Sequence, residues 1–261
     1  PQAVDRIVDA VLSRGRVEYI GGVRGVDRIP LPRGRGVIAP VPISEGCLSE
    51  CSFCITKISR GRVRSYPPRV IVDAVKELVF RGYKEIELAS QDSAVYGFDI
   101  GRGFLLPDLI LGVAEVDGDF MVRVGMMNPQ WLWKILDDLI EAIKHPKVYK
   151  FLHIPVQSGD NRVLRIMRRG YTVEEFEEMI SEIRRKIPEI TIATDIIVGH
   201  PGEDEEAFKN TLALMERARF DRVHLAQYSI RPLTEAAAMP QVPEPIKKRR
   251  SIEAQKLQEK I

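Results

Sequence analysis

The stretch Gly46-Cys47-Leu48-Ser49-Glu50-Cys51-Ser52-Phe53-Cys54 decides how this sequence is interpreted. Its cysteines have the spacing C-x3-C-x2-C, and the chain of 261 residues has no other cysteine. An odd, tightly clustered set is a poor disulfide framework, and in a reducing compartment such a set more often binds metal. The motif directly follows an apolar run. We therefore expect it at the carboxyl end of a buried strand, where α/β barrels place their active sites.

Three thiolates at this spacing can converge on one metal centre. They cannot saturate a [4Fe–4S] cluster, whose ordinary ligation is four cysteines, so one iron would stay open for a cofactor or substrate. A structural zinc site would need a fourth ligand. The four histidines are all distant in sequence and none has a ligand-type spacing. Zinc, or three plainly buried cysteines, are the minority alternatives.

Six short apolar runs follow one another along the chain, separated by longer amphipathic segments. The runs are rich in Val, Ile and Leu and lack clean polar alternation, as buried parallel strands do. Such alternation predicts a parallel α/β sheet or barrel, and six units are too few for the usual eight-stranded barrel. We therefore predict an α/β fold, a partial (βα)6 barrel of the TIM type. The predicted strands cover 36–43, 85–89, 120–125, 150–155, 191–198 and 222–228, and the predicted helices cover 68–81, 104–115, 130–144, 160–186 with a break at Gly170, and 203–218.

The chain divides into a lead-in over 1–36, the barrel over 37–239 and a tail with a charged helix over 240–261. The lead-in has a short helical pattern that includes Val4, followed by a Gly/Arg-rich linker over 21–36. The cations at 247–250 are expected to form a solvated helix face. The net charge is only +2, so a nucleic-acid role must rest on local clusters. No membrane span or signal peptide is predicted, which indicates a cytoplasmic protein.

With Phe53 before its last cysteine, the motif resembles the hallmark of the radical S-adenosylmethionine (SAM) superfamily. By that resemblance Cys47, Cys51 and Cys54 each ligate one iron of a [4Fe–4S] cluster, and the amino and carboxylate groups of SAM chelate the fourth. The reduced cluster then donates an electron to the sulfonium and releases a 5′-deoxyadenosyl radical. Phe53 would pack by the cluster and the adenine.

Further stretches resemble the methylthiotransferase family, in its threonylcarbamoyladenosine tRNA branch of archaea and eukaryotes. The resemblance implies a sulfur-transferring enzyme that methylthiolates N6-threonylcarbamoyladenosine next to the anticodon of tRNA. One SAM would donate a methyl group and a second would yield the radical. It also implies tRNA and a reductant protein as partners; we expect no membrane partner and favour a monomer. The matching stretches are 45–60, 87–97, 123–129, 151–159, 194–203 and 227–234.

Polar or small residues at the predicted strand ends are candidate cofactor-binding residues. Amide, hydroxyl and carboxylate groups suit the ammonium and ribose hydroxyls of SAM, and an arginine can pair with a carboxylate. A glycine lets the backbone approach the adenosyl moiety closely. Each of these residues could instead stabilise a turn or cap a helix. The candidates are Ser90, Gln91, Asp92, Arg123, Gln157, Ser158, Asp195 and Gly199.

A basic segment follows the cysteine motif directly. Cations beside an active site would attract a phosphate backbone, and a tyrosine among them could stack on a base. The alternative is a solvated arginine-rich loop. The candidate tRNA-contacting residues are Lys57, Arg60, Arg62, Arg64 and Tyr66.

Members of the methylthiotransferase family, which this sequence resembles, usually carry two further domains. An N-terminal domain holds three more cysteines and a second [4Fe–4S] cluster, and a small β-barrel that binds RNA closes the chain. Residues 1–36 contain no cysteine, so we expect them to be a remnant of the upstream domain, with 240–261 leading to an absent RNA-binding domain. His200 departs from the family's hydrophobic or aromatic residue and is given no role. The rival functions are a methylthiotransferase for isopentenyl-adenosine tRNA or a ribosomal-protein aspartate, and a non-catalytic metal-bearing RNA-binding module.

Overall fold

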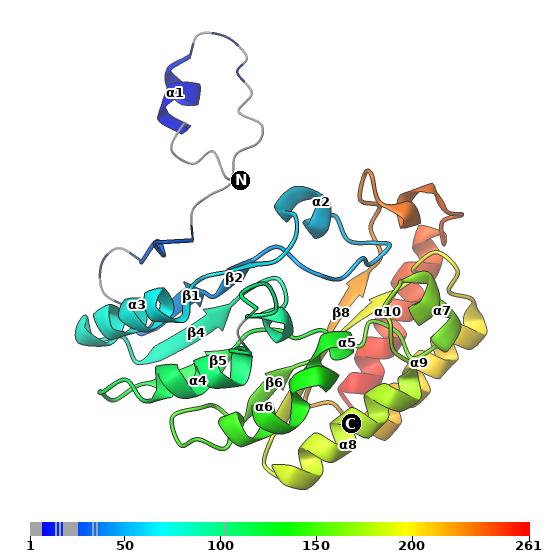
Figure 1. The fold of residues 1–261 in the computed structure, drawn as a ribbon. Helices are drawn as coiled ribbons and strands as arrows, with labels where there is room; N and C mark the ends of the chain where they lie inside the picture. Colours follow the sequence, from blue (N-terminus) through cyan, green and yellow to red (C-terminus); the bar gives the residue numbers. More distant parts are fainter. Residues whose placement is uncertain are drawn as a thin grey trace.

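Six parallel strands alternate with helices in the computed structural model, which describes residues 7–13, 15, 17, 26–32, 34, 36–101 and 103–261 (Figure 1). The six predicted strands are confirmed, and each boundary lies within two residues of the prediction, the ordinary uncertainty of strand ends. The strands are β1 (Ile38–Pro42), β4 (Glu85–Ala89), β5 (Met121–Val124), β6 (Phe151–His153), β7 (Thr191–Val198) and β8 (Arg222–Gln227).

The strands form two parallel halves, ordered β1-β4-β5 and β6-β7-β8. The halves are joined beside β5, where Val122 bridges to Val148 and the Met127 N–H donates to the His153 carbonyl at 2.9 Å. Strand order therefore follows chain order from β1 to β8. Successive parallel strands connected through helices are the arrangement of a TIM-type barrel, here with six strands. The predicted partial (βα)6 barrel is confirmed.

Helices accompany the strands, and Figure 1 shows α3 and α4 beside β1, β4 and β5. The predicted helix over 130–144 is divided into α5, η3 and α6, and the break at Gly170 is confirmed, with a φ of 72°. Caps explain several starts: Asp160 caps α7, Thr172 with Glu175 forms a capping box on α8, and Asp204 caps α9. The larger helices are α3 (Pro68–Phe80), α4 (Leu106–Ala114), α6 (Leu136–Ile143), α8 (Val173–Lys186), α9 (Glu205–Ala218) and α10 (Glu244–Gln258); the shorter ones are α1 (Ile7–Leu12), α2 (Thr56–Arg60), η2 (Ser93–Val95), α5 (Pro129–Leu132), η3 (Trp133–Ile135), α7 (Asn161–Ile166) and η4 (Glu235–Ala238).

Alternate residues along the strands divide between two faces. One set, which includes Ile86 and Ile196, is fully buried and packs into the core that the helices cover. The other set is partly exposed and carries charged and imidazole groups. These residues define what we call the inner face of the barrel: Glu87, Arg123, His153, Asp195 and His224.

A short antiparallel ribbon, which the sequence did not predict, frames the cysteine loop. It pairs β2 (Ser44–Glu45) with β3 (Arg64–Ser65), and the cysteine motif and α2 lie between its strands. Gly46 begins the loop with a φ of 81°, and a Cβ there would lie 2.2 Å from the Arg62 carbonyl oxygen. Only glycine fits this approach, so the ribbon closes tightly at the base of the loop.

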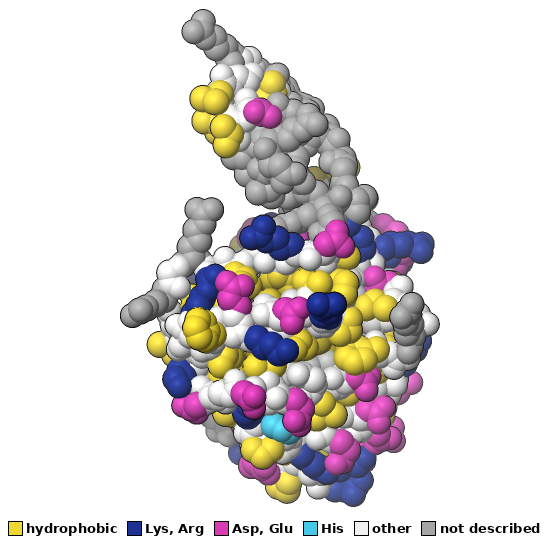
Figure 2. All heavy atoms as spheres, turned by 60° about the vertical axis from the view of Figure 1, so that its left-hand side comes forward, with side chains coloured by type: hydrophobic (Ala, Val, Ile, Leu, Met, Phe, Trp, Pro, Cys, Tyr) yellow, Lys and Arg dark blue, Asp and Glu magenta, His cyan; other side chains and the backbone are white. Residues whose placement is uncertain are grey.

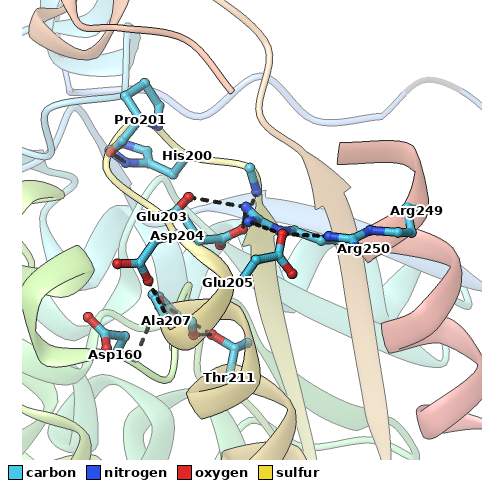
Figure 3. Close-up of polar contacts among 12 residues, drawn as sticks. Asp160, His200, Pro201, Glu203, Asp204, Glu205, Ala207, Thr211, Arg249 and Arg250 are labelled. Carbon is cyan, nitrogen blue, oxygen red and sulfur yellow. Dashed lines mark hydrogen bonds and ion pairs between the residues drawn. The ribbon is translucent and has the colours of Figure 1, made fainter. Parts of the chain in front are cut away.

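The prediction that the cations at 247–250 form a solvated face is wrong for two of them. Lys247 and Arg250 are 1% and 2% exposed. Lys247 Nζ donates to the Tyr228 carbonyl at 3.0 Å, and Arg250 pairs with Glu203 at 2.6 Å (Figure 3). Their partners are supplied by other elements, which the charge run alone could not reveal.

The lead-in contributes α1, which confirms the predicted short helix, although Val4 and part of the predicted linker lie outside the described residues. The apolar side chains of α1 form the yellow group in the upper part of Figure 2. On the body of the molecule in that view, cations and carboxylates are interspersed. No helix in the described part of the chain is both long and apolar enough to cross a membrane.

Candidate metal and cofactor site

The three cysteines lie on the wall of one cavity of about 360 Å³, so the structure brings the motif's side chains together. The cavity lies beyond the carboxyl ends of the strands, because its walls come mainly from the loops that follow β1, β4, β5 and β6. This is where α/β barrels assemble their sites. The lining residues are Cys47, Ser49, Cys51, Phe53, Cys54, Thr56, Lys57, Ser90, Gln91, Asp92, Met126, Asn128, Gln157 and Arg169.

Each cysteine sulfur accepts a hydrogen bond from a different donor. Donors aimed at sulfur stabilise thiolates and tune the potential of a metal cluster that they hold. The protein therefore orients all three sulfurs before any metal binds. The bonds run from the Ser49 N–H to Cys47 Sγ (3.3 Å), from the Thr56 N–H to Cys54 Sγ (3.4 Å) and from the Arg169 guanidinium to Cys51 Sγ (3.3 Å).

Arg169 is a functional residue that the sequence reasoning missed. It is 4% exposed, and besides Cys51 it donates to the Pro155 carbonyl and to the Tyr171 hydroxyl. Burial alone would lower the pKa of Arg169, but Tyr171 and Cys51 outweigh burial and raise it. A fixed cation thus stands beside one sulfur. Its position directly before the predicted break at Gly170 was the available signal.

The lining of the cavity argues against a structural zinc site. Such a site takes four ligands, almost always Cys or His. The described residues that line the cavity include the three cysteines but no histidine and no fourth cysteine. Three thiolates suit a cluster in which each takes a different iron.

The surroundings of Cys47 favour the protonated thiol over the thiolate. Burial raises the pKa of Cys47 above its ordinary value, and the nearby Asp92 carboxylate raises it further, while hydrogen bonds from Ser49 oppose the shift. Because the thiolate is the ligand, metal binding must release this proton. Assembly of the metal centre therefore becomes more favourable as the pH rises.

Two buried acceptor atoms on residues that line the cavity have no partner in the described structure, Asp92 Oδ2 and Gln157 Oε1. Asp92 uses its other oxygen to accept from the backbone N–H groups of Ala94 and Asn128. Burial raises the pKa of Asp92 to about 6, although those two N–H groups and Arg169 oppose the shift. A buried acceptor without a partner is costly. The cavity therefore suits a ligand that brings N–H or O–H donors.

Two other predicted residues at the cavity tie its loops together. Gln91 Oε1 accepts from the Gly46 N–H at 2.7 Å, which joins the loop after β4 to the base of the cysteine loop. Ser90 Oγ lies 3.2 Å from Ser93 Oγ. Asn128 and Ser49, both missed from the sequence, bond side chain to side chain at 2.7 Å. Gln91 and Ser90 thus hold the cavity walls in place as well as lining the cavity.

Phe53 packs in a row of rings beside the cavity. Its ring meets His200 edge-on at 5.8 Å, and His200 meets Tyr228 at 5.2 Å. Burial lowers the pKa of His200 to about 4, so the imidazole is neutral at pH 7. His200 Nδ1 lies 2.8 Å from the Pro201 carbonyl and donates to it. A neutral histidine here packs as an aromatic ring, which accounts for its place in this sequence.

Two predicted cofactor residues lie on the inner face, outside the cavity lining. Arg123 pairs with Glu87 at 2.7 Å. Asp195 Oδ1 lies 2.7 Å from His153 Nε2 and 3.0 Å from His224 Nδ1. The side chains of Arg123 and Asp195 thus pair with other residues of the inner face rather than with the cysteines.

Ser158 and Gly199 also lie outside the cavity lining. Ser158 is fully buried and its Oγ accepts from the Asp160 N–H at 3.3 Å, in the turn into α7. Gly199 has a φ of 72°, and a Cβ there would lie 2.3 Å from Lys247 Cγ. The glycine leaves room for the buried lysine, and its N–H donates to Glu203 at 2.8 Å.

The basic segment after the motif is partly committed to ion pairs. Lys57 lines the cavity and pairs with Glu50, and Arg64 has an ion pair with Glu45. Arg60 and Arg62 are exposed.

The structure does not support the stacking role predicted for Tyr66, because this residue is 1% exposed. Its hydroxyl donates to Glu45 at 3.1 Å, and its backbone carbonyl accepts from the Tyr96 hydroxyl at 2.9 Å. A ring packed in this way offers no face to a nucleobase. Sequence alone showed a tyrosine among cations, whereas the fold turns it into the core.

The chain is similar to several curated tRNA-modifying enzymes. It is 49% identical over 257 residues to a Pyrococcus abyssi protein named "Probable threonylcarbamoyladenosine tRNA methylthiotransferase", covering 96% of this chain and 60% of that protein. An Archaeoglobus fulgidus protein of the same name is 46% identical, over 100% and 63% of the two chains. The Homo sapiens threonylcarbamoyladenosine tRNA methylthiotransferase is 39% identical, over 96% and 45%. The chain thus spans about three fifths, or less, of these relatives' lengths.

Solved structures show the same fold at low identity. The radical SAM methyltransferase TsrM from Kitasatospora setae, with tryptophan and aza-SAM bound, matches with a TM-score of 0.63 and 15% identity, over 78% of this chain and 38% of that one. Coproporphyrinogen III oxidase (HemN) from Escherichia coli matches with a TM-score of 0.59 and 16% identity, over 85% and 51%. The model of the "Radical SAM superfamily" matches residues 41–215, which include all three cysteines. The chain therefore belongs to the radical SAM superfamily.

Proposed function

We propose that Cys47, Cys51 and Cys54 hold a [4Fe–4S] cluster and that SAM binds beside it in the cavity. One observation carries this proposal: the three sulfurs share a cavity wall, and the described residues that line this cavity include no histidine and no fourth cysteine. A cluster with three cysteine ligands keeps one iron for a cofactor. When bound, this pair would supply a 5′-deoxyadenosyl radical by one-electron cleavage of the sulfonium.

The residues around the cavity have separate tasks toward this cofactor pair. Asp92 Oδ2 and Gln157 Oε1 are acceptors for the ammonium and hydroxyl donors that SAM carries. Phe53, which lines the cavity with the cysteines and packs edge-on against His200, would pack against the bound cluster. Arg169 places a fixed positive charge at Cys51, which favours the thiolate and the added electron of a reduced cluster. These assignments use only groups that already face the cavity.

For the whole protein we propose methylthiolation of N6-threonylcarbamoyladenosine next to the anticodon of tRNA. The names and identities of the archaeal and human relatives support this substrate. Residues 37–239 are the radical SAM barrel in this proposal, and 240–261 form its closing helix. The exposed Arg60 and Arg62, beside the cavity loop, are the cations that we assign to the RNA backbone.

The proposed partners and surroundings follow from the same activity. A reductant protein is needed because the cluster must receive an electron for every radical formed. The second cluster that the family resemblance implies, a cytoplasmic location and a monomeric state stay predictions.

The substrate assignment is tested with the full-length protein, reconstituted anaerobically with iron and sulfide. It is incubated with SAM, a reductant and tRNA that carries threonylcarbamoyladenosine, and nucleosides are analysed by mass spectrometry. We expect the mass increase of one methylthio group on that nucleoside, and none with a Cys51→Ala variant. Methylthiolation of isopentenyl-adenosine tRNA instead, or modification without the cysteine, would contradict the proposal.

A further inference from the structure

The inner face of the barrel contains a compact group of three ligand-type residues that the cysteine site does not use. His153 on β6, Asp195 on β7 and His224 on β8 bring two imidazole nitrogens to one carboxylate oxygen, at 2.7 Å and 3.0 Å. Parallel pairing places Asp195 directly opposite His224. The side chains are 20%, 29% and 44% exposed in that order, so an ion or small ligand could reach them.

The charge at this group is negative when the histidines are neutral. Burial alone would raise the pKa of Asp195, but its bonds and charge interactions with His153 and His224 outweigh burial and lower it. Asp195 is therefore ionised at neutral pH. The inner-face cation Arg123 is paired with Glu87. The Asp195 carboxylate is thus the anionic ligand that the group offers to a cation.

The group is close to the cysteine cavity but separate from it. The Asp195 carbonyl accepts from the Gln157 N–H at 2.8 Å, and Gln157 lines the cavity. Ile197, two residues further along β7, packs in the cluster that includes Phe53. One strand step of two residues is about 7 Å. None of the three residues lines the cysteine cavity.

We propose that His153, Asp195 and His224 form a binding site for a divalent first-row transition-metal ion. Two neutral imidazoles and one carboxylate are a ligand set that zinc, iron, cobalt and nickel accept. Three strands fix the ligands, which keeps them together in the absence of an ion. Three protein ligands leave coordination positions open toward the inner face, as in sites that take a substrate or water as a further ligand.

The test measures binding of Co²⁺ alone by isothermal titration calorimetry and visible absorption. The cysteines are first replaced (Cys47→Ser, Cys51→Ser and Cys54→Ser), so that thiolates cannot take the metal. We expect one equivalent of Co²⁺ per chain, without sulfur charge-transfer bands. Losing a direct ligand should weaken binding by at least about 100-fold, because even outer-sphere partners are worth about 10- to 100-fold.

Two ligand variants and one matched control decide the outcome. His224→Ala and His153→Ala are each expected to lose binding, and circular dichroism checks their fold. His145→Ala, which removes a partly exposed histidine after α6, should bind Co²⁺ like the parent. Absence of Co²⁺ binding in the parent, or equal binding in the parent and both ligand variants, would overturn the proposal. The proposed tRNA activity does not enter this measurement.

Discussion

Replacing the buried carboxylate Asp92 by the amide of the same shape should stabilise the cofactor-free chain while weakening SAM binding. Asp92 is 1% exposed, and burial raises its pKa from 3.8 to about 6. Asp92→Asn keeps an oxygen to accept from the Ala94 and Asn128 N–H groups. It removes the buried charge that opposes folding at neutral pH.

The raised pKa of Asp92 sets both the size of the stability difference and its direction with pH. A folded pKa raised above the unfolded value means that the folded chain binds more protons, so stability falls as the pH rises from about 4 to about 6. The full shift corresponds to about 3 kcal/mol. Removing this charge should therefore favour Asp92→Asn over the parent by about 2 kcal/mol more at pH 7.5 than at pH 4.5.

Urea unfolding of both proteins at the two pH values measures this difference. The exposed Asp73→Asn on α3 is the matched control and should change stability little at either pH. In the cluster-loaded protein, Asp92→Asn should weaken SAM binding about 10- to 100-fold, since a hydrogen bond to a charged group contributes about 1.5 to 3 kcal/mol. A stability advantage of Asp92→Asn over the parent that shrinks as the pH rises, or an unchanged SAM affinity of Asp92→Asn, would refute the reasoning.

Three further substitutions test other contacts. Arg250→Met should lower the free energy of unfolding by about 3 to 5 kcal/mol, because it leaves the buried Glu203 carboxylate without its main partner; urea denaturation measures this. Gly199→Ala places a Cβ 2.3 Å from Lys247 Cγ at a φ of 72°, so it should lower the free energy of unfolding by more than about 1 kcal/mol. Adding Lys247→Ala removes the clash but not the strained backbone, so it should not restore all of that loss. Arg169→Gln removes a fixed cation near the proposed cluster. At a charge separation of roughly 6 Å and an effective dielectric of about 20, this cation stabilises the added electron by about 3 kcal/mol. Redox titration should therefore show the cluster's reduction potential falling on the order of 100 mV.

The sequence predicted features that depend on local patterns. The apolar runs located all six barrel strands, and the cysteine spacing located the centre of the site. Contacts between residues that are distant in sequence could not be predicted from such patterns. Arg169 reaches Cys51 across 118 positions, and Arg250 reaches Glu203 across 47. Neither separation leaves a periodic signal along the chain.

The same limit explains the errors at charged and aromatic positions. The cation at Lys247 and the ring of Tyr66 looked suited to solvent and RNA, yet both are buried by elements that are far away along the chain. The grouping of Asp195 with His153 and His224 likewise depends on which strands pair. Strand register, rather than composition, decides those contacts.

The central claim is that three cysteines hold a [4Fe–4S] cluster with one iron available to SAM. It is tested most directly by anaerobic reconstitution of the chain with iron and sulfide, followed by iron analysis and electron paramagnetic resonance of the reduced protein with and without SAM. We predict four irons per chain and a spectrum that changes when SAM is added, both lost in Cys51→Ala. A chain that binds zinc but no iron, or a cluster spectrum that SAM leaves unchanged, would contradict the account.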